Sequence, residues 1–472
     1  MRILLTGTTG YIGQRLLPVL LKNGHQVICC VRDKKRFNIK KYNSSKLTVI
    51  EVNFLEKETL ANIPKDIDIA YYLIHSMSAA IDKFEEMEAL SAENFKYRLQ
   101  ETDVKQVIYL SGIINDEKLS KHLSSRKRVE EILSGSTFNL TTLRAGIIVG
   151  SGSASFEIVR DLVEKLPVMI APKWLNSRSQ PLAVRNVIEY LTRVILQTET
   201  YNQSFDIGGP EILTYKQLLL QFAEVRGLKR HILSVPVMTP KLSSYWLYFI
   251  TSTSYKLAVN LVNSMKIDVV CRENTLNEIL GIELLTYKQA VQNAFDKIAQ
   301  QEVISSWTDA LASNVLDKGV SRLLEVPVYG CFKDHRKKII VGEKETLDRI
   351  WAIGGEKGWY YANWLWSLRG FLDKMMGGVG LRRGRKNDIH ISAGESLDFW
   401  RVIYASRDEK RLLLYAEMKL PGEAWLEFKI KNNTLHQTAT FRPKGLSGRI
   451  YWYSVLPFHG LIFNGMIKKL TE

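Results

Sequence analysis

The first 23 residues hold the feature that most restricts what this chain can fold into. An apolar run at residues 1–5 precedes glycines at 7, 10 and 13, and a helical pattern follows from about residue 14 to 23. Such a turn needs a positive φ at Gly7, open space at Gly10 for a diphosphate, and close helix packing at Gly13. Free N–H groups at the helix N-terminus then attract the anion. We therefore predict a dinucleotide site, rather than a purely structural turn, that contains Thr6, Gly7, Thr9, Gly10, Tyr11, Ile12 and Gly13.

The end of the second expected strand, residues 26–31, bears on which dinucleotide binds. Arg32 stands there, followed by Asp33 and three further cations at 34–36. An acid at this place binds a free ribose 2′-hydroxyl, whereas an arginine suits a 2′-phosphate. We favour NADP over NAD on this ground. The alternative is that Arg32 belongs to a solvated loop and that Asp33 binds the ribose.

Later segments alternate between strands and helices. Strands are expected at 47–52, 69–74, 107–110 and 140–143, with helices at about 80–100 and 119–133. This order predicts an α/β Rossmann fold, a doubly wound parallel sheet with helices on both faces. Because ligands bind at the carboxyl ends of such strands, one rim should gather Gly7, Arg32, Ile74, His75, Ser111 and Arg144.

The bulk composition sets the remaining limits. With 472 residues the chain should hold more than one domain, and we place the boundaries at 1–300, with a substrate-side segment at about 151–300, and 301–472. Four cysteines and eight histidines show no metal-binding spacing, so no metal is expected. The absence of a leader pattern and of an apolar run of about 18 residues favours a cytoplasmic protein. A net charge of +16 suggests acidic partners such as nucleotide phosphates, anionic lipid or nucleic acid, and the alternative is that much of this charge lies on solvated helix faces.

Several phrases carry a resemblance to a known family. The glycine turn, Ser111 and the run Phe205–Pro210 resemble the short-chain dehydrogenase/reductase superfamily, in particular its atypical, NmrA-like branch. The phrases at 109–112, 144–157 and 166–170 resemble a bacterial subgroup with a C-terminal domain of uncharacterised function. That resemblance implies a second, α+β domain similar to the START-like helix-grip fold. It also implies that Asn53 stands where relatives usually contact the adenine ring with an aspartate.

The catalytic pair of that superfamily is replaced here. Relatives carry Tyr-x-x-x-Lys on the helix after strand five, and the alignment places His122 and Arg126 in those two positions. Ser111 matches the serine that holds the substrate oxygen. Histidine titrates near neutral pH, at about 6.5, whereas arginine stays charged. Our hypothesis is that His122 acts as the general acid. The alternative is that His122 is an ordinary exposed helix residue and the usual reductase chemistry is absent.

The segment Gly150–Ser155 opens another helix, predicted to start at Phe156. It could cap a nicotinamide or bind an anion, or Ser155 could simply cap the helix.

The last third of the chain is rich in tryptophan and turn signals. We expect strands at 326–332, 399–405, 411–418, 424–430 and 436–442 and a helix at 459–469. The START-like resemblance implies a hydrophobic ligand between sheet and helix, and a filled core is the alternative. Inward or rim positions would then be taken by Glu417, Trp425, Gln437, Phe441 and His459. The basic run 381–386 suits a peripheral membrane or phosphate contact, or a solvated loop. No nucleic-acid motif accompanies it.

Two functions fit these patterns. The first is an NADP(H)-binding atypical short-chain dehydrogenase/reductase, an oxidoreductase that acts on a hydrophobic carbonyl or hydroxyl compound. The second is a non-catalytic NADP-binding sensor or scaffold whose C-terminal domain binds lipid or a partner.

Overall fold

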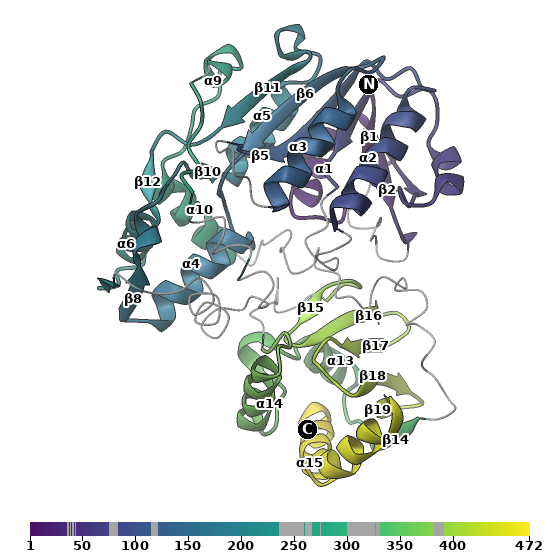
Figure 1. Cartoon of the computed structure of the whole chain (residues 1–472). Helices are drawn as coiled ribbons and strands as arrows, with labels where there is room; N and C mark the ends of the chain where they lie inside the picture. Colours follow the sequence, from purple (N-terminus) through teal and green to yellow (C-terminus); the bar gives the residue numbers. More distant parts are fainter. Residues whose placement is uncertain are drawn as a thin grey trace. The chain divides into compact units, whose positions relative to one another are not determined.

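The computed structural model of the chain describes residues 1–34, 37, 39, 42, 44–74, 84–114, 121–235, 259, 267–273, 275–299, 326, 331–381 and 391–472. The chain forms two compact units, Met1–Thr251 with Tyr255–Asn314 and Val315–Glu472 with Ser252–Ser254. Figure 1 shows both units.

A parallel seven-stranded sheet forms the centre of the first unit. Its order is β11-β6-β5-β4-β1-β2-β3, with all neighbours parallel. The strands are β1 (Arg2–Leu5), β2 (Gln26–Val31), β3 (Leu47–Glu51), β4 (Ile69–Tyr72), β5 (Gln106–Gly112), β6 (Asn139–Ala145) and β11 (Gln203–Ile207). This confirms the predicted Rossmann architecture.

Helices bury both faces of this sheet. One face packs on α1 (Gly13–Lys22) and α5 (Val184–Arg193), and the other on α2 (Phe84–Leu99) and α3 (Lys121–Leu133). Along β1, Ile3 and Leu5 belong to the core on the α1 side, whereas Leu4 belongs to the core on the α2 side. In a strand that is buried on both faces, apolar side chains do not alternate with polar ones. This is why residues Ile3 to Leu5 of β1 form a continuous apolar run.

Smaller elements extend the first unit beyond the sheet. Helices α4 (Ala154–Lys165), α6 (Tyr215–Val225) and α10 (Tyr287–Ala299) share a third core, and α9 is Leu276–Ile279. Short strand pairs join β7 (Ile148–Val149) with β10 (Leu182–Ala183), β9 (Arg178–Ser179) with β12 (Leu213–Thr214), and β8 (Val168–Pro172) with β13 (His231–Val235).

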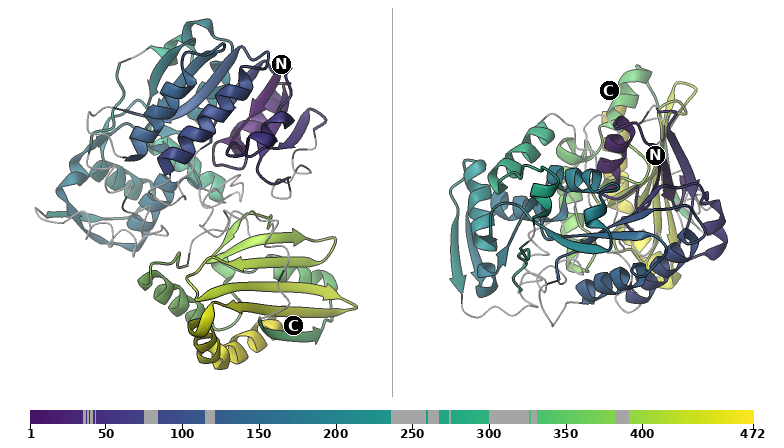
Figure 2. Two further views of the ribbon diagram at one scale, coloured as in Figure 1. Left: turned by 45° about the vertical axis from the view of Figure 1, so that its right-hand side comes forward. Right: turned by 90° about the horizontal axis from the view of Figure 1, so that it is seen from above.

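The second unit is an antiparallel sheet with a long C-terminal helix (Figure 2). The six-stranded order is β14-β19-β18-β17-β16-β15. Its elements are β14 (Phe332–Ile339), α13 (Glu343–Trp351), α14 (Asn363–Met375), β15 (Ser396–Leu397), β16 (Trp400–Ser406), β17 (Arg411–Ala416), β18 (Gly422–Lys431), β19 (Thr434–Pro443) and α15 (Gly445–Thr471). Helix α15 packs against β14 and β19. The START-like assignment stays a prediction.

One expected element of this unit lies largely outside the described residues, and another was placed wrongly. Most of the strand predicted at 326–332 falls on residues that the structure does not describe. Strand β14 begins at Phe332, and charged residues on this edge strand hide its pattern in the sequence. The C-terminal helix starts at Gly445, not at residue 459. Pro457 and glycines 448, 460 and 465 lie within it and conceal its first half, since such residues disfavour helix interiors.

The five residues proposed for a ligand cavity have defined surroundings. Glu417 forms an ion pair of 2.8 Å with Arg401, and both side chains are fully buried. Trp425 packs edge-on against Tyr415, and Phe441 stacks on Trp452. Gln437 is buried, and His459 lies between Trp452 and Phe463. Aromatic rings thus pack against Trp425, Phe441 and His459, and the ligand cavity stays a prediction.

Candidate functional site

The glycine turn between β1 and α1 has the geometry that a diphosphate needs. Gly7 has a φ of +62°, and a Cβ there would lie 2.3 Å from the Leu73 carbonyl oxygen. A Cβ at Gly13 would lie 2.4 Å from the Gly7 carbonyl oxygen, so only glycine allows α1 to start this close to the turn. At Gly10 the nearest atom would be 3.0 Å away, again the Gly7 oxygen. Of the three glycines, Gly10 has the least crowded Cβ position, and the approach of a ligand there stays a prediction.

The N-terminus of α1 is suited to an anion. Its N-cap residue, Ile12, has no polar side chain to occupy the helix N–H groups, and its first turn contains no acidic residue. The positive end of the helix dipole is thus uncompensated by protein carboxylates in that turn. A dinucleotide diphosphate fits this end of the helix.

The threonines of the turn form hydrogen bonds with other parts of the protein. The Thr6 hydroxyl donates a hydrogen bond to the Tyr71 carbonyl at 2.8 Å and accepts one from the Leu73 amide at 3.0 Å. These two bonds link the residue that follows β1 to the end of β4. The Thr9 carbonyl accepts a hydrogen bond of 2.8 Å from the Gln14 side chain. The hydroxyl of Thr6 therefore shapes the turn, and contact of Thr6 or Thr9 with a cofactor stays a prediction.

Tyr11 connects this turn to the loop before α4. Its hydroxyl donates to the Ser151 carbonyl at 3.3 Å, and Arg15 donates to the same oxygen at 2.7 Å. The Arg15 guanidinium lies 4.1 Å from the Tyr11 ring centre. Burial raises the pKa of Tyr11 to about 12, against the lowering effect of Arg15. The phenol is therefore a neutral hydrogen-bond donor. Arg15 was not predicted as part of this arrangement.

The residues of this loop form hydrogen bonds that cap the N-terminus of α4. Ser153, not Ser155, accepts the Phe156 amide, because the helix starts at Ala154 rather than at Phe156. The Gly152 amide donates to Glu157 at 3.1 Å. Helix capping, one of the two alternatives from the sequence, is what this loop does.

Arg32 and Asp33 differ sharply in exposure at the end of β2. Arg32 is exposed, whereas Asp33 is buried and already engaged in the fold. Asn53 follows β3, and its side chain donates to Glu56 at 2.8 Å and accepts from the Leu55 amide at 3.2 Å. Both ends of the Asn53 amide thus have local partners, so its predicted adenine contact would require one of them to be exchanged.

Ser111 lies at the end of β5, as predicted. It is buried, and its hydroxyl makes no well-formed hydrogen bond among the described residues, although it lies close to the Tyr109 hydroxyl. Burial raises the pKa of Tyr109, against the lowering effects of Arg126 and Ser111. A buried hydroxyl without a full complement of partners is costly unless a ligand or water supplies one. Ser111 therefore has hydrogen-bonding capacity that is not fully used at the end of β5.

Arg126 on α3 reaches the same strand. Its Nη1 donates to the Leu110 carbonyl at 2.9 Å, and its Nε is buried without a partner in the described chain. A Cβ at Gly112 would lie 3.1 Å from Leu123, so the first turn of α3 lies against the end of β5. His122 belongs to that turn. The structure does not describe the side chain of His122 or any part of His75. Ile74, which follows β4, is part-buried.

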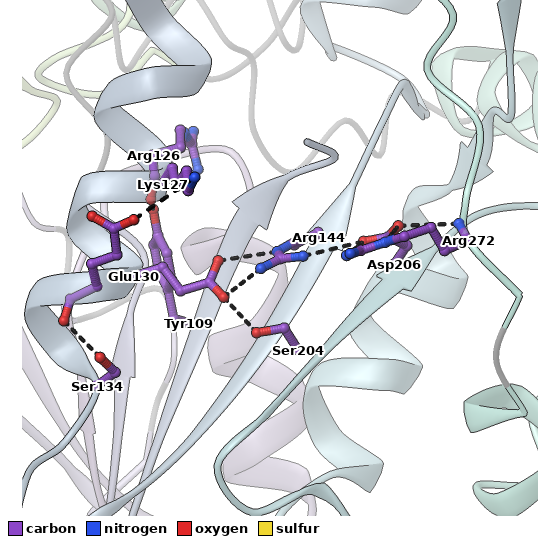
Figure 3. Close-up of polar contacts among 10 residues, drawn as sticks. Tyr109, Arg126, Lys127, Glu130, Ser134, Arg144, Ser204, Asp206 and Arg272 are labelled. Carbon is purple, nitrogen blue, oxygen red and sulfur yellow. Dashed lines mark hydrogen bonds and ion pairs between the residues drawn. The ribbon is translucent and has the colours of Figure 1, made fainter. Parts of the chain in front are cut away.

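Two acidic groups that the sequence did not indicate hold α3 in place. On α2, the buried Glu88 accepts a hydrogen bond of 2.5 Å from Ser125. On α3, Glu130 accepts two hydrogen bonds from Arg144 and one from Ser204 (Figure 3). Arg144 also lies 3.8 Å from Asp206, which pairs with Arg272. Arg144 is thus part of an ion-pair network, and its predicted cofactor contact stays untested.

Comparisons with known proteins agree with the geometry of each unit. Residues 7–165 match a family model described as NAD(P)H-binding, and residues 331–466 match a family of proteins of unknown function, DUF2867. The first unit thus has a Rossmann fold in which residues 7–165 match NAD(P)H-binding proteins, and residues 331–466 of the second unit match DUF2867.

The individual relatives share little sequence identity with this chain. The chain is 23% identical over 253 residues to an Arabidopsis thaliana chloroplastic divinyl chlorophyllide a 8-vinyl-reductase, and the match spans 50% of this chain and 60% of that protein. It is 21% identical over 246 residues to the photosystem II assembly factor Ycf39 of Trieres chinensis, across 52% and 75% of the two chains. A Staphylococcus aureus nucleoside-diphosphate-sugar epimerase aligns with a TM-score of 0.51 and 16% identity, over 62% of this chain and 100% of that one. This last likeness concerns the fold.

Proposed function

We propose that the chain is an NADP(H)-dependent oxidoreductase acting on a hydrophobic compound with a carbonyl or hydroxyl group. The observation that carries the proposal is the turn from Gly7 to Gly13, in which Gly7 and Gly13 leave no room for a Cβ and the following helix has no side-chain cap at its N-terminus. The match to an NAD(P)H-binding family supports it, as does the resemblance to a protein named as a reductase.

Preference for NADP rests on Arg32. An exposed guanidinium at the end of β2 can bind a 2′-phosphate through two hydrogen bonds. Asp33 is buried and engaged, so its carboxylate is poorly placed to bind a free 2′-hydroxyl. The charge at this strand end therefore favours the phosphorylated coenzyme.

The chemistry of the bound coenzyme is hydride transfer at C4 of the nicotinamide. The chain would supply the oxygen contact and the proton. Ser111 has the unused hydroxyl to hold a substrate oxygen at the end of β5. Arg126 remains charged at neutral pH, so it can orient a ribose or an anion but cannot act as an acid. His122, one turn earlier on α3, is the group that can release a proton near pH 7.

Turnover measurements test this assignment. The full chain is incubated with NADPH and a panel of hydrophobic aldehydes, ketones and enones, and loss of reduced coenzyme is followed by absorbance. We expect turnover with at least one compound. Both Ser111→Ala and His122→Phe should lower kcat about a hundredfold while the Kd for NADPH is unchanged. Ser134→Ala, an exposed serine at the end of the same helix, should match the unaltered chain.

Two outcomes would count against the proposal. If NADPH binds and is never oxidised, the chain is a coenzyme-binding sensor or scaffold. If His122→Phe retains full turnover, the proton comes from another group.

A further inference from the structure

The outward side of α14 is apolar along its whole length. Six large side chains there have exposed fractions between 43% and 67%, and they are Trp364, Leu368, Phe371, Leu372, Met375 and, at the C-cap, Met376. Their spacing of three, four and one residues places them along one stripe of the helix. We call this stripe the α14 face. The opposite side of the helix buries Leu365 and Trp366 in the core of the unit, so α14 is apolar on two sides.

The first half of α15 has a similar exposed side. Six apolar residues there are between 41% and 73% exposed: Leu446, Ile450, Tyr453, Leu456, Phe458 and Leu461. The two helices are in contact inside the unit, because the rings of Trp366 on α14 and Phe463 on α15 lie 6.4 Å apart. Soluble monomers rarely expose so many large apolar side chains on adjacent elements without a partner for them.

The charged side chains that α14 and α15 themselves expose have one sign. Helix α15 contains no acidic residue, and the single acid of α14, Asp373, is fully buried, where it accepts hydrogen bonds from the Gly380 and Lys419 amides. Arg369 lies on α14 and donates to the Lys419 carbonyl at 3.4 Å. The Lys419 ammonium lies near the C-terminal end of the helix, 3.2 Å from where a Cβ on Gly377 would stand. In the sequence, four more cations follow at 382–386.

We propose that the α14 face, together with the exposed side of α15, lies on the surface of an anionic lipid membrane. An apolar stripe rich in Trp, Phe, Leu and Met, bordered by Lys and Arg, is the pattern of helices that lie in the plane of a bilayer interface. Basic residues beside it add attraction to anionic headgroups. Within the described part of the chain, no helix is long and apolar enough to cross a bilayer. In this proposal α14 and α15 lie on the membrane surface.

A second copy of the chain fits this surface less well. A twofold pairing would bring the same patch together with itself, and the cations around α14 would then face like charges. An anionic surface has the opposite charge and accepts the exposed apolar residues as well.

Vesicle sedimentation of the full chain tests the proposal. Vesicles of phosphatidylcholine alone are compared with an equimolar mixture of phosphatidylcholine and phosphatidylglycerol. We expect the chain to bind the anionic vesicles about tenfold more tightly, and high salt to reduce this difference. The double variant Trp364→Asp/Phe371→Asp should lower binding by at least about tenfold. Both side chains are exposed, so the variant should keep the circular dichroism of the original chain.

Val341→Asp is the matched control. Val341 is 95% exposed and lies between β14 and α13, outside both helices, so this variant should bind vesicles like the original chain. Failure of the original chain to sediment with anionic vesicles would overturn the proposal. So would a lipid-free dimer, seen by analytical ultracentrifugation, that Trp364→Asp/Phe371→Asp converts to monomer, since the face would then belong to a second copy.

Discussion

Arg144 on β6 donates two hydrogen bonds to the carboxylate of Glu130 on α3, at 3.0 and 2.6 Å. Both side chains are largely buried, with 14% and 13% of their surface exposed. The pair fastens the helix that carries His122 and Arg126 to the sheet whose strand ends form the candidate site. It therefore acts on that site by positioning α3.

Glu130→Gln should destabilise the first unit and weaken the site. Removal of one charge leaves Arg144 largely buried with fewer compensating partners, which costs about 2–4 kcal/mol. Urea unfolding measures the loss in free energy of unfolding. The neighbouring Glu131→Gln removes only an exposed contact of 4.0 Å with Lys127 and should change stability by less than about 0.5 kcal/mol. Equal stability of the two variants would show that the pair does not hold α3.

Arg32→Ala should change which coenzyme binds. Loss of the guanidinium removes a charge-assisted contact with the 2′-phosphate, so the Kd for NADPH should rise about tenfold while that for NADH changes less than about twofold. Lys105→Ala, an exposed cation before β5, controls for the general loss of positive charge. If instead Asp33→Asn weakens NADH binding and Arg32→Ala has no effect, Asp33 binds the ribose and the coenzyme is NAD.

The second unit should lose stability in mild acid through His459. Burial lowers the pKa of His459 from 6.5 to about 4, so the folded state holds this imidazole neutral while the unfolded state binds a proton. Stability from this group is complete above about pH 6.5 and decreases as the pH falls toward 4, by up to about 3 kcal/mol.

His459→Phe should remove that part of the acid sensitivity. The comparison is the free energy of unfolding of the two chains between pH 4 and 7. His231→Asn, which changes an exposed histidine on β13 in the first unit, is the control and should keep the pH dependence that comes from His459. An unchanged slope in His459→Phe would mean that other groups account for acid unfolding.

Local patterns predicted the first unit well and its polar network poorly. The sheet could be anticipated because buried parallel strands such as β1 and β2 are continuous apolar runs, and because Gly7 and Gly13 mark a turn with one known use. The pairing of Arg144 with Glu130 could not, since the two residues come from different elements and any arginine at a strand end looks available for a ligand. Glu88 and Arg15 gave no signal for the same reason, as their partners are distant in sequence.

In the second unit, the strands could be predicted from the sequence, whereas the long C-terminal helix was predicted only in part. Strands β16 to β19 were visible because their apolar residues lie between clear turns. Helix α15 was half hidden, because Pro457 and its glycines oppose helix propensity, and packing against β14 and β19 overrides that preference.

Titration calorimetry of the full chain with NADPH and NADH tests the central claim most directly, namely that the turn from Gly7 to Gly13 holds the diphosphate of a nicotinamide dinucleotide. We predict measurable heat of binding with NADPH, and a Kd at least about tenfold weaker in Gly10→Ala, whose added methyl occupies the space in front of the turn. Gly460→Ala, where a Cβ meets nothing within 4 Å, should bind like the original chain. Absence of heat with both coenzymes, or unaltered NADPH binding in Gly10→Ala, would contradict the account.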